Sequence, residues 1–186
     1  MPTVSSVVPI DELRTWVAAR VRAGVIGAPE HAEARRAELL DAVHGDSSMF
    51  VGGLRALLLQ SLHPLAMAGV AEHSDYRADP WGRLQRTADF LAATTYGPAS
   101  EAERAVARVR AVHQRVVGVA PDGRPYAAND PHLLRWVHLA EIDSFLAAHD
   151  RYGADPLSPA ERDAYVRDAA VVARALGVPA PPESVR

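Results

Sequence analysis

Proline residues that directly follow a helix-capping side chain divide this sequence into segments. Asp79-Pro80, Asp130-Pro131 and Ser158-Pro159 each precede a run in which apolar residues recur every three or four positions. An N-cap Asp or Ser accepts a backbone N–H, and proline suits the next position because the first turn needs no amide donor there. No stretch shows the sustained alternation that is typical of a half-buried strand. The pattern predicts an all-α fold, a single-domain bundle of several helices.

Helix boundaries follow from the same signals. We predict helices over about residues 11–22, 29–44, 46–67, 79–96, 100–118, 130–151 and 158–176. Pro64 should kink or break the third of them near Gln60, because proline lacks the amide donor. The β-like run 116–119 is interpreted as a helix end, and residues 120–129 as a loop. The helices within residues 1–45 are expected to precede a catalytic domain over 46–186.

Composition excludes several classes of protein. The chain has 186 residues, of which 48% are hydrophobic, enough for one domain with a sizeable core. A net charge of -3 gives no general argument for nucleic-acid binding. The absence of cysteine excludes disulfides, iron–sulfur clusters, cysteine nucleophiles and thiolate-ligated or covalently attached haem.

The most apolar stretch, residues 51–70, is long enough to be compared with a membrane span. It contains Arg55, Gln60, His63 and Pro64, which are costly in a lipid-facing helix. We therefore expect a buried helix there and no stable membrane span. The N-terminus lacks the basic and long apolar regions of a signal peptide, so a cytoplasmic location is the default expectation.

The eight histidines fall into groups by their position. Those at helix ends or on polar faces are expected at the surface; these are His31, His44, His73 and His132. His149, followed by Asp150, is expected near a helix C-terminus, because the dipeptide alone is weak evidence for a phosphohydrolase dyad. His63, His113 and His138 lie inside apolar helical stripes.

His113 shares a helical face with Val106, Val109 and Val116. It could be a core histidine that is hydrogen-bonded to a carbonyl. It could also be an imidazole held in an apolar wall, with one nitrogen binding iron and the other bonded to an acceptor. For His63 and His138, a structural hydrogen-bonding role is the better interpretation.

Arg83, Arg86 and Thr87 are spaced to lie on one face of a helix. Two neighbouring guanidinium groups repel each other unless an anion or carboxylates lie between them. The face could be an exposed basic stripe paired with nearby carboxylates, or a wall that faces an anion. The residues alone leave both interpretations open.

Seven segments, in this order, resemble the catalytic domain of MpaB-type oxygenases and rubber oxygenases (latex clearing proteins). They are GGLRALLLQ (52–60), LHPLAMAGV (62–70), HSDY (73–76), DPWGRLQRT (79–87), VHQRVVG (112–118), DGRPYAANDP (122–131) and WVH (136–138). The resemblance covers about residues 46–180. It is carried by the ordered set, because each segment alone is a weak signal.

The resemblance implies an all-helical protein that binds haem b noncovalently in a buried pocket. The family's axial histidine lies in the segment matched by ArgValArgAlaValHis, which points to His113 as the iron ligand, with His63 and His138 as less favoured candidates. The family's distal residues match Arg83, Arg86 and Thr87. Rubber oxygenases have a lysine where this chain has Arg86, and a guanidinium is a poor metal ligand. A hydrogen-bonding role is therefore expected for Arg86.

The implied activity is that of a haem-dependent oxygenase acting on an apolar, isoprenoid-like small molecule with dioxygen. Arg86 and Thr87 would donate hydrogen bonds to dioxygen at the haem, and Arg83 would neutralise a propionate or orient Arg86. Two alternatives stay open: a haem-binding or sensor protein without turnover, and a cofactor-free helical scaffold. The family's domain usually continues with further helices beyond the segment that resembles ProAlaProProGluSerVal, and this chain stops at Arg186, so it is interpreted as either a naturally short member or a fragment.

Overall fold

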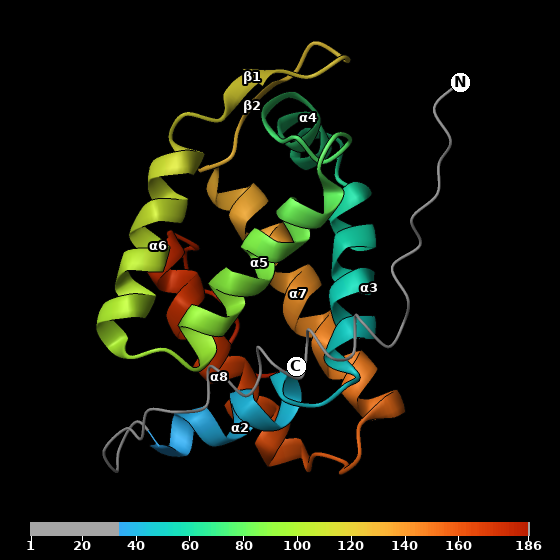
Figure 1. Ribbon diagram of the computed structural model, residues 1–186, viewed down its shortest axis with the longest axis vertical. Coiled ribbons are helices and arrows are strands. Elements are labelled where there is room, and N and C mark those ends of the chain that lie inside the picture. The colour runs from blue at the N-terminus through green and yellow to red at the C-terminus, as the bar shows by residue number, and fades with distance from the viewer. Residues whose placement is uncertain (1–33, 186) are drawn as a thin grey trace.

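The computed structural model describes residues 34–185 as an all-α bundle, which confirms the predicted fold class (Figure 1). Its helices are α2 (Ala34–His44), α3 (Met49–Ser61), α4 (Pro64–His73), α5 (Pro80–Thr95), α6 (Ala99–His113), α7 (Pro131–Tyr152) and α8 (Pro159–Leu176). The helix predicted over residues 11–22, and the start of the next one at Pro29, lie outside the described residues.

The three proline-marked helix starts are confirmed. Asp79 Oδ1 accepts from the backbone N–H of Gly82 at 2.8 Å, and Asp130 Oδ1 accepts from that of His132 at 2.7 Å. Ser158 forms a reciprocal capping box with Glu161 at the start of α8. Each cap satisfies amide donors that have no partner within the helix, so these side chains fix where α5, α7 and α8 begin.

The predicted break at Pro64 is also confirmed. α3 ends at Ser61 and α4 begins at Pro64, and the two axes are bent by 101°. His63 stands between them in an extended conformation, where its Nδ1 accepts the Ala66 N–H at 3.4 Å. Within residues 34–185 no single helix is long and apolar enough to cross a membrane, although α3 and α4 taken together meet the length and composition criteria.

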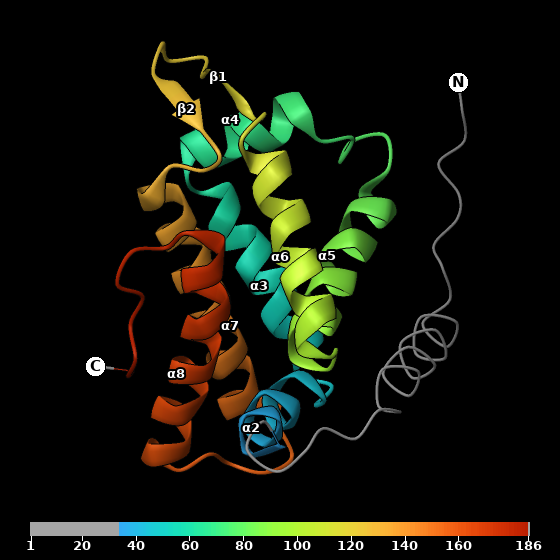
Figure 2. The same ribbon diagram turned by 90° about the vertical axis from the view of Figure 1, so that its left-hand side faces the viewer.

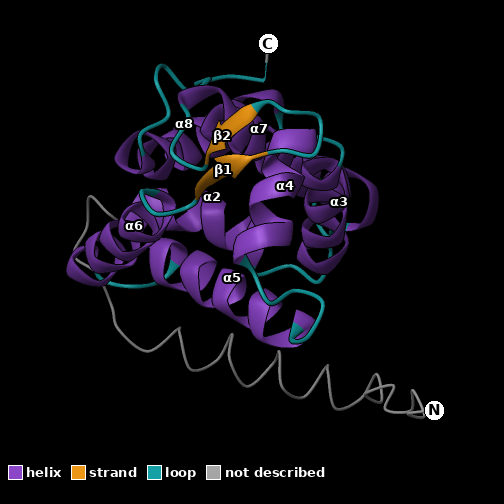
Figure 3. Cartoon of the chain, turned by 90° about the horizontal axis from the view of Figure 1, so that it is seen from above, coloured by secondary structure: helices purple, strands orange, loops and turns teal. Residues whose placement is uncertain are grey.

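The interpretation of residues 116–119 as a helix end is wrong. α6 stops at His113, and β1 (Val117–Val119) pairs antiparallel with β2 (Pro125–Ala127), with Val117 opposite Ala127. Gly123 makes the turn with φ of 86°, a conformation that suits glycine. The hairpin packs on α4 and lies across one end of the bundle (Figure 3).

The buried core lies at the other end of the bundle, where α2, α7 and α8 meet. Its fully enclosed members include Val43, Phe145, Tyr165 and Val166. α3 runs close beside α7 because Gly52 has no side chain: a Cβ there would come within 2.8 Å of the Phe145 ring. Figures 1 and 2 show α2 and the beginning of α8 at the end opposite the hairpin.

Candidate functional site

A cavity of about 960 Å³ runs through the bundle and is lined by residues from every described helix and from β2. This volume is near the upper end of the range for small-molecule sites, roughly 300–1,000 Å³. Most lining residues are apolar. The charged and titratable ones include His44, His73, Arg83, Arg86, Arg108, His113, Tyr126, His138, Glu141 and Tyr165.

Arg83, Arg86 and Thr87 all line this cavity from α5. Arg83 Nη1 donates to Ser74 Oγ at 3.0 Å, and burial, followed by the nearby charge of Arg86, lowers the pKa of the Arg83 guanidinium. Arg86 is more exposed and lies 3.6 Å from the Asp79 carboxylate. The α5 face therefore belongs to a cavity wall and is not merely a solvated basic stripe.

Thr87 uses its hydroxyl hydrogen within its own helix. Thr87 Oγ1 donates to the Arg83 carbonyl at 3.1 Å. A hydroxyl group has one hydrogen and two acceptor positions, so in this rotamer Thr87 can accept a hydrogen bond from a ligand, and it can donate one only after its hydroxyl rotates.

His113 is the last residue of α6 and reaches the same cavity as the α5 residues. It is partly buried, and desolvation lowers the pKa of its imidazole below the ordinary value. The ring is therefore neutral at physiological pH and offers a nitrogen lone pair. His113 of α6 and the α5 residues, which the sequence put on separate helices, thus line one cavity.

His63 and His138 lie in different surroundings in the structure. His63 does not line the cavity; it caps α4, and its ring lies against Trp136 with a centroid separation of 5.5 Å. His138 does line the cavity and is 8% exposed, and its Nε2 has no hydrogen-bond partner in the part of the chain that the structure describes. Burial, and secondarily the charge of Arg135, lowers its pKa to about 4.

The prediction that His44 lies at the surface is wrong. It is 6% exposed, its Nε2 is hydrogen-bonded to the Tyr165 hydroxyl at 3.0 Å, and burial lowers its pKa to about 4. Its ring also packs against Phe145, with centroids 4.6 Å apart. The prediction failed because the last turn of α2 is covered by α7 and α8, a tertiary contact that a helix-end position does not reveal.

The two other described histidines expected at the surface are exposed. His132 lies in the first turn of α7. His73 is exposed and also lines the cavity, where its Nε2 is hydrogen-bonded to the Tyr126 hydroxyl at 3.1 Å. Tyr126 in turn donates to Glu72, a bond that raises the pKa of Tyr126 to about 12. His31 lies outside the described residues.

Glu141 was not predicted as a site residue. It follows His138 by three positions on α7 and lines the cavity. Burial raises the pKa of its carboxyl to about 7, and its charge adds to the effect of burial in raising the pKa of Tyr165. The available signal was an acidic residue in the apolar stripe that contains Leu134, His138 and Phe145.

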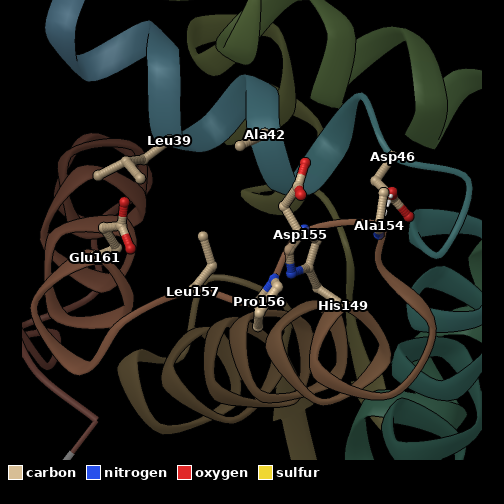
Figure 4. A pocket seen from close by; sticks show the side chains of 9 residues that line it. All are labelled: Leu39, Ala42, Asp46, His149, Ala154, Asp155, Pro156, Leu157 and Glu161. Carbon is tan, nitrogen blue, oxygen red and sulfur yellow. Dashed lines mark hydrogen bonds between the residues drawn. The ribbon is translucent and has the colours of Figure 1, made fainter.

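A second cavity, of about 490 Å³, lies between α2, the end of α7 and the loop that leads into α8 (Figure 4). Two of its carboxylates accept hydrogen bonds from the backbone next to helix ends. Asp46 accepts from the N–H groups of Ser48 and Ala154, and Glu161 accepts from the N–H group of Ser158. His149 lines it and is 4% exposed, whereas the neighbouring Asp150 pairs with Arg162 at 2.6 Å. His149 Nδ1 has no hydrogen-bond partner among residues 34–185. The larger cavity is nevertheless the candidate site, because it is lined by Arg83, Arg86, Thr87 and His113.

Comparison with known proteins places the chain in a family. The model described as "ER-bound oxygenase mpaB/B'/Rubber oxygenase, catalytic domain" matches residues 42–186. The chain belongs to this family. No curated protein and no solved structure matches it.

Membership of the MpaB/rubber oxygenase family supports oxygenase activity in general, with dioxygen and a small molecule as reactants. The matched range contains α5 and α6, which carry the predicted site residues at the large cavity. Within residues 34–185, no three His, Asp or Glu side chains converge as a group that could hold a metal ion. No imidazole at the cavity therefore belongs to such a group within these residues.

Proposed function

We propose that this chain is a haem b-dependent oxygenase that oxidises or cleaves an apolar, isoprenoid-like small molecule. The observation that carries the proposal is that one cavity of about 960 Å³ is lined by both His113 of α6 and the Arg83, Arg86 and Thr87 face of α5. These are the positions at which the family resemblance puts the axial ligand and the distal residues.

The residues at the cavity fit a haem by their chemistry. A noncovalent haem is commonly held by an axial protein ligand such as an imidazole nitrogen, and His113 offers a neutral ring. The propionates need cations, and Arg83 carries a guanidinium that donates a hydrogen bond to the uncharged Ser74 hydroxyl. The remaining walls are largely apolar, as a porphyrin face requires. When bound, the haem would supply the redox-active iron that activates dioxygen.

Arg86 is the residue we assign to hydrogen bonding with dioxygen. Its ion pair with Asp79 is long and exposed, so it contributes little energy and leaves the guanidinium free to turn toward the cavity. A permanently protonated guanidinium can donate hydrogen bonds where negative charge develops on oxygen. Thr87 would add a second donor once its hydroxyl turns away from the Arg83 carbonyl.

Oxidative cleavage of an alkene by dioxygen balances without an external reductant: the carbon–carbon double bond and the dioxygen bond break, and two carbonyl groups form. The apolar walls would hold the alkene and exclude water from it.

The test is dioxygen consumption by haem-loaded protein, with the isoprenoid alcohol farnesol as the alkene probe and ¹⁸O₂ to follow the label. We expect consumption that requires both haem and probe, with ¹⁸O in the carbonyl products. A matched pair of variants, His113→Ala and His63→Ala, controls for loss of an apolar-stripe histidine, and only the first should abolish activity. Protein that stays colourless after haem addition, or that binds haem and consumes no dioxygen with the probe, would overturn the proposal.

A further inference from the structure

Two polar side chains, those of His138 and Glu141, lie on the α7 side of the large cavity. His138 Nε2 is buried and has no hydrogen-bond partner in the part of the chain that the structure describes. Glu141 lies one helical turn further on, and its carboxyl also lines the cavity. A buried polar group left without a partner costs about 1–3 kcal/mol, so the presence of His138 in a largely apolar cavity calls for an explanation.

A pure hydrocarbon would offer neither side chain a hydrogen-bond partner. Positions three apart on a helix place Cβ atoms about 5–6 Å from each other, so one small polar group can reach both side chains. A neutral imidazole offers one donor and one acceptor nitrogen, and a hydroxyl group can both donate and accept. A hydroxyl can therefore satisfy His138 in either tautomer and still bond to Glu141.

The charges around the cavity disfavour a charged ligand group at this point. A carboxylate would be repelled by Glu141 whenever that side chain is ionised. An ammonium group would share the cavity with Arg83 and Arg86 on α5. Burial lowers the pKa of His138 to about 4 and raises that of Glu141 to about 7, so both side chains are largely uncharged in slightly acidic solution.

The position between His138 and Glu141 lies on the α7 side of the cavity, near Tyr165 of α8. The Tyr165 hydroxyl is already bonded to His44, so it is committed to the fold. α7 and α5 lie on opposite sides of the bundle in Figure 2, and both line the cavity. A ligand held at Glu141 therefore leaves the α5 wall free for haem and dioxygen.

We propose that His138 and Glu141 bind a hydroxyl group of the substrate, which makes the substrate class an apolar chain that carries an alcohol and not a plain hydrocarbon. This inference rests on the proposed oxygenase function, because it assigns the specificity of the same cavity.

The test compares the affinity of haem-loaded protein for farnesol and for the hydrocarbon that lacks only its hydroxyl group, measured by calorimetry. Wild type should bind the alcohol at least about 10-fold more tightly, which is about 1.4 kcal/mol and the size of one or two net hydrogen bonds. Glu141→Leu should weaken binding of the alcohol alone and bring the preference below about 3-fold. Glu141→Gln, which keeps a polar amide, should retain most of the preference.

Thr94→Val is the matched control. Thr94 also lines the cavity, but its hydroxyl already donates to the backbone of its own helix, so its removal should leave the preference unchanged. Equal affinity of wild type for the two probes would overturn the inference, even if Glu141→Leu failed to fold. So would a full alcohol preference in folded Glu141→Leu. The haem absorption of each sample is read in parallel: loss of haem from wild type contradicts the proposed function, whereas loss of the alcohol preference with haem intact contradicts this inference alone.

Discussion

The α5 and α7 sides of the large cavity differ in the kind of polar group that they present. α5 carries Arg83 and Arg86, which keep their charge at any physiological pH. α7 carries His138 and Glu141, whose pKa values are shifted by burial toward their uncharged forms. Fixed cations suit haem propionates and developing negative charge, whereas uncharged groups suit a neutral polar group. Under the proposed function, the α5 side would face the cofactor and dioxygen, and the α7 side would recognise the substrate.

Of the tests that compare the α5 and α7 sides, we expect the largest effect, on turnover, from a substitution of Arg86. Arg86→Ala should lower turnover per bound haem by at least about 10²-fold, the typical cost of losing one preorganised donor, and leave the haem content unchanged. Arg83→Ala should instead speed haem dissociation. The measurements are steady-state turnover and haem transfer to a scavenger protein. Arg77→Ala is the control, because Arg77 is outside the cavity and stacks on Tyr76. Equal losses in Arg77→Ala and Arg86→Ala would contradict the role of the α5 wall.

A smaller effect is expected where α3 supports the α7 side. Gly52→Ala should lower the free energy of unfolding by about 1–3 kcal/mol, because its Cβ would lie 2.8 Å from the Phe145 ring and 3.1 Å from the Phe145 Cα. Gly53→Ala is the matched control in the same helix, because a Cβ there meets nothing within 4 Å. Since alanine favours helix over glycine by about 1 kcal/mol, Gly53→Ala should stabilise. Denaturant unfolding of both variants checks this, and a Gly52→Ala protein as stable as Gly53→Ala would refute the close approach.

The last effect concerns the pH dependence of stability through Glu141. Its folded pKa of about 7 exceeds the ordinary 4.5, so the folded state holds the proton more tightly than the unfolded state. The free energy of unfolding should therefore fall as pH rises from about 4.5 to about 7, by at most about 1.4 kcal/mol per pH unit. Glu141→Gln should lack this decline.

His44 and His138 act in the opposite direction, because their lowered pKa values cost stability as pH falls from 6.5 toward 4. They are present in both proteins, so the difference between wild type and Glu141→Gln isolates the carboxyl. The measurement is urea unfolding across this pH range. Parallel stability curves for the two proteins would show that Glu141 titrates normally and is not buried.

The sequence predicted the α5 wall better than the α7 side for a physical reason. Arg83, Arg86 and Thr87 share one helix, so their common face follows from helical spacing alone. His44 and Tyr165 come from different helices, and their contact exists only after α2 packs against α8. Glu141 was visible in an apolar stripe, but spacing does not tell whether such a carboxyl turns to water or to a cavity.

The hairpin shows a second limit of sequence analysis. Its strands are three residues long, too short for alternation to distinguish a strand from a helix end. By contrast, the starts of α5, α7 and α8 were predicted to the residue, because capping is a local interaction between neighbours in the chain.

The central claim, that His113 holds a haem in the large cavity, is tested most directly by titrating haem into four proteins and recording visible absorption spectra. Wild type, His63→Ala and His138→Ala should each form a Soret band at one haem per chain, and acid-acetone should extract the pigment. His113→Ala should lose the band or shift it strongly, because the iron loses its imidazole. A His113→Ala protein with the wild-type spectrum, or loss of the band in His138→Ala or His63→Ala alone, would contradict the account.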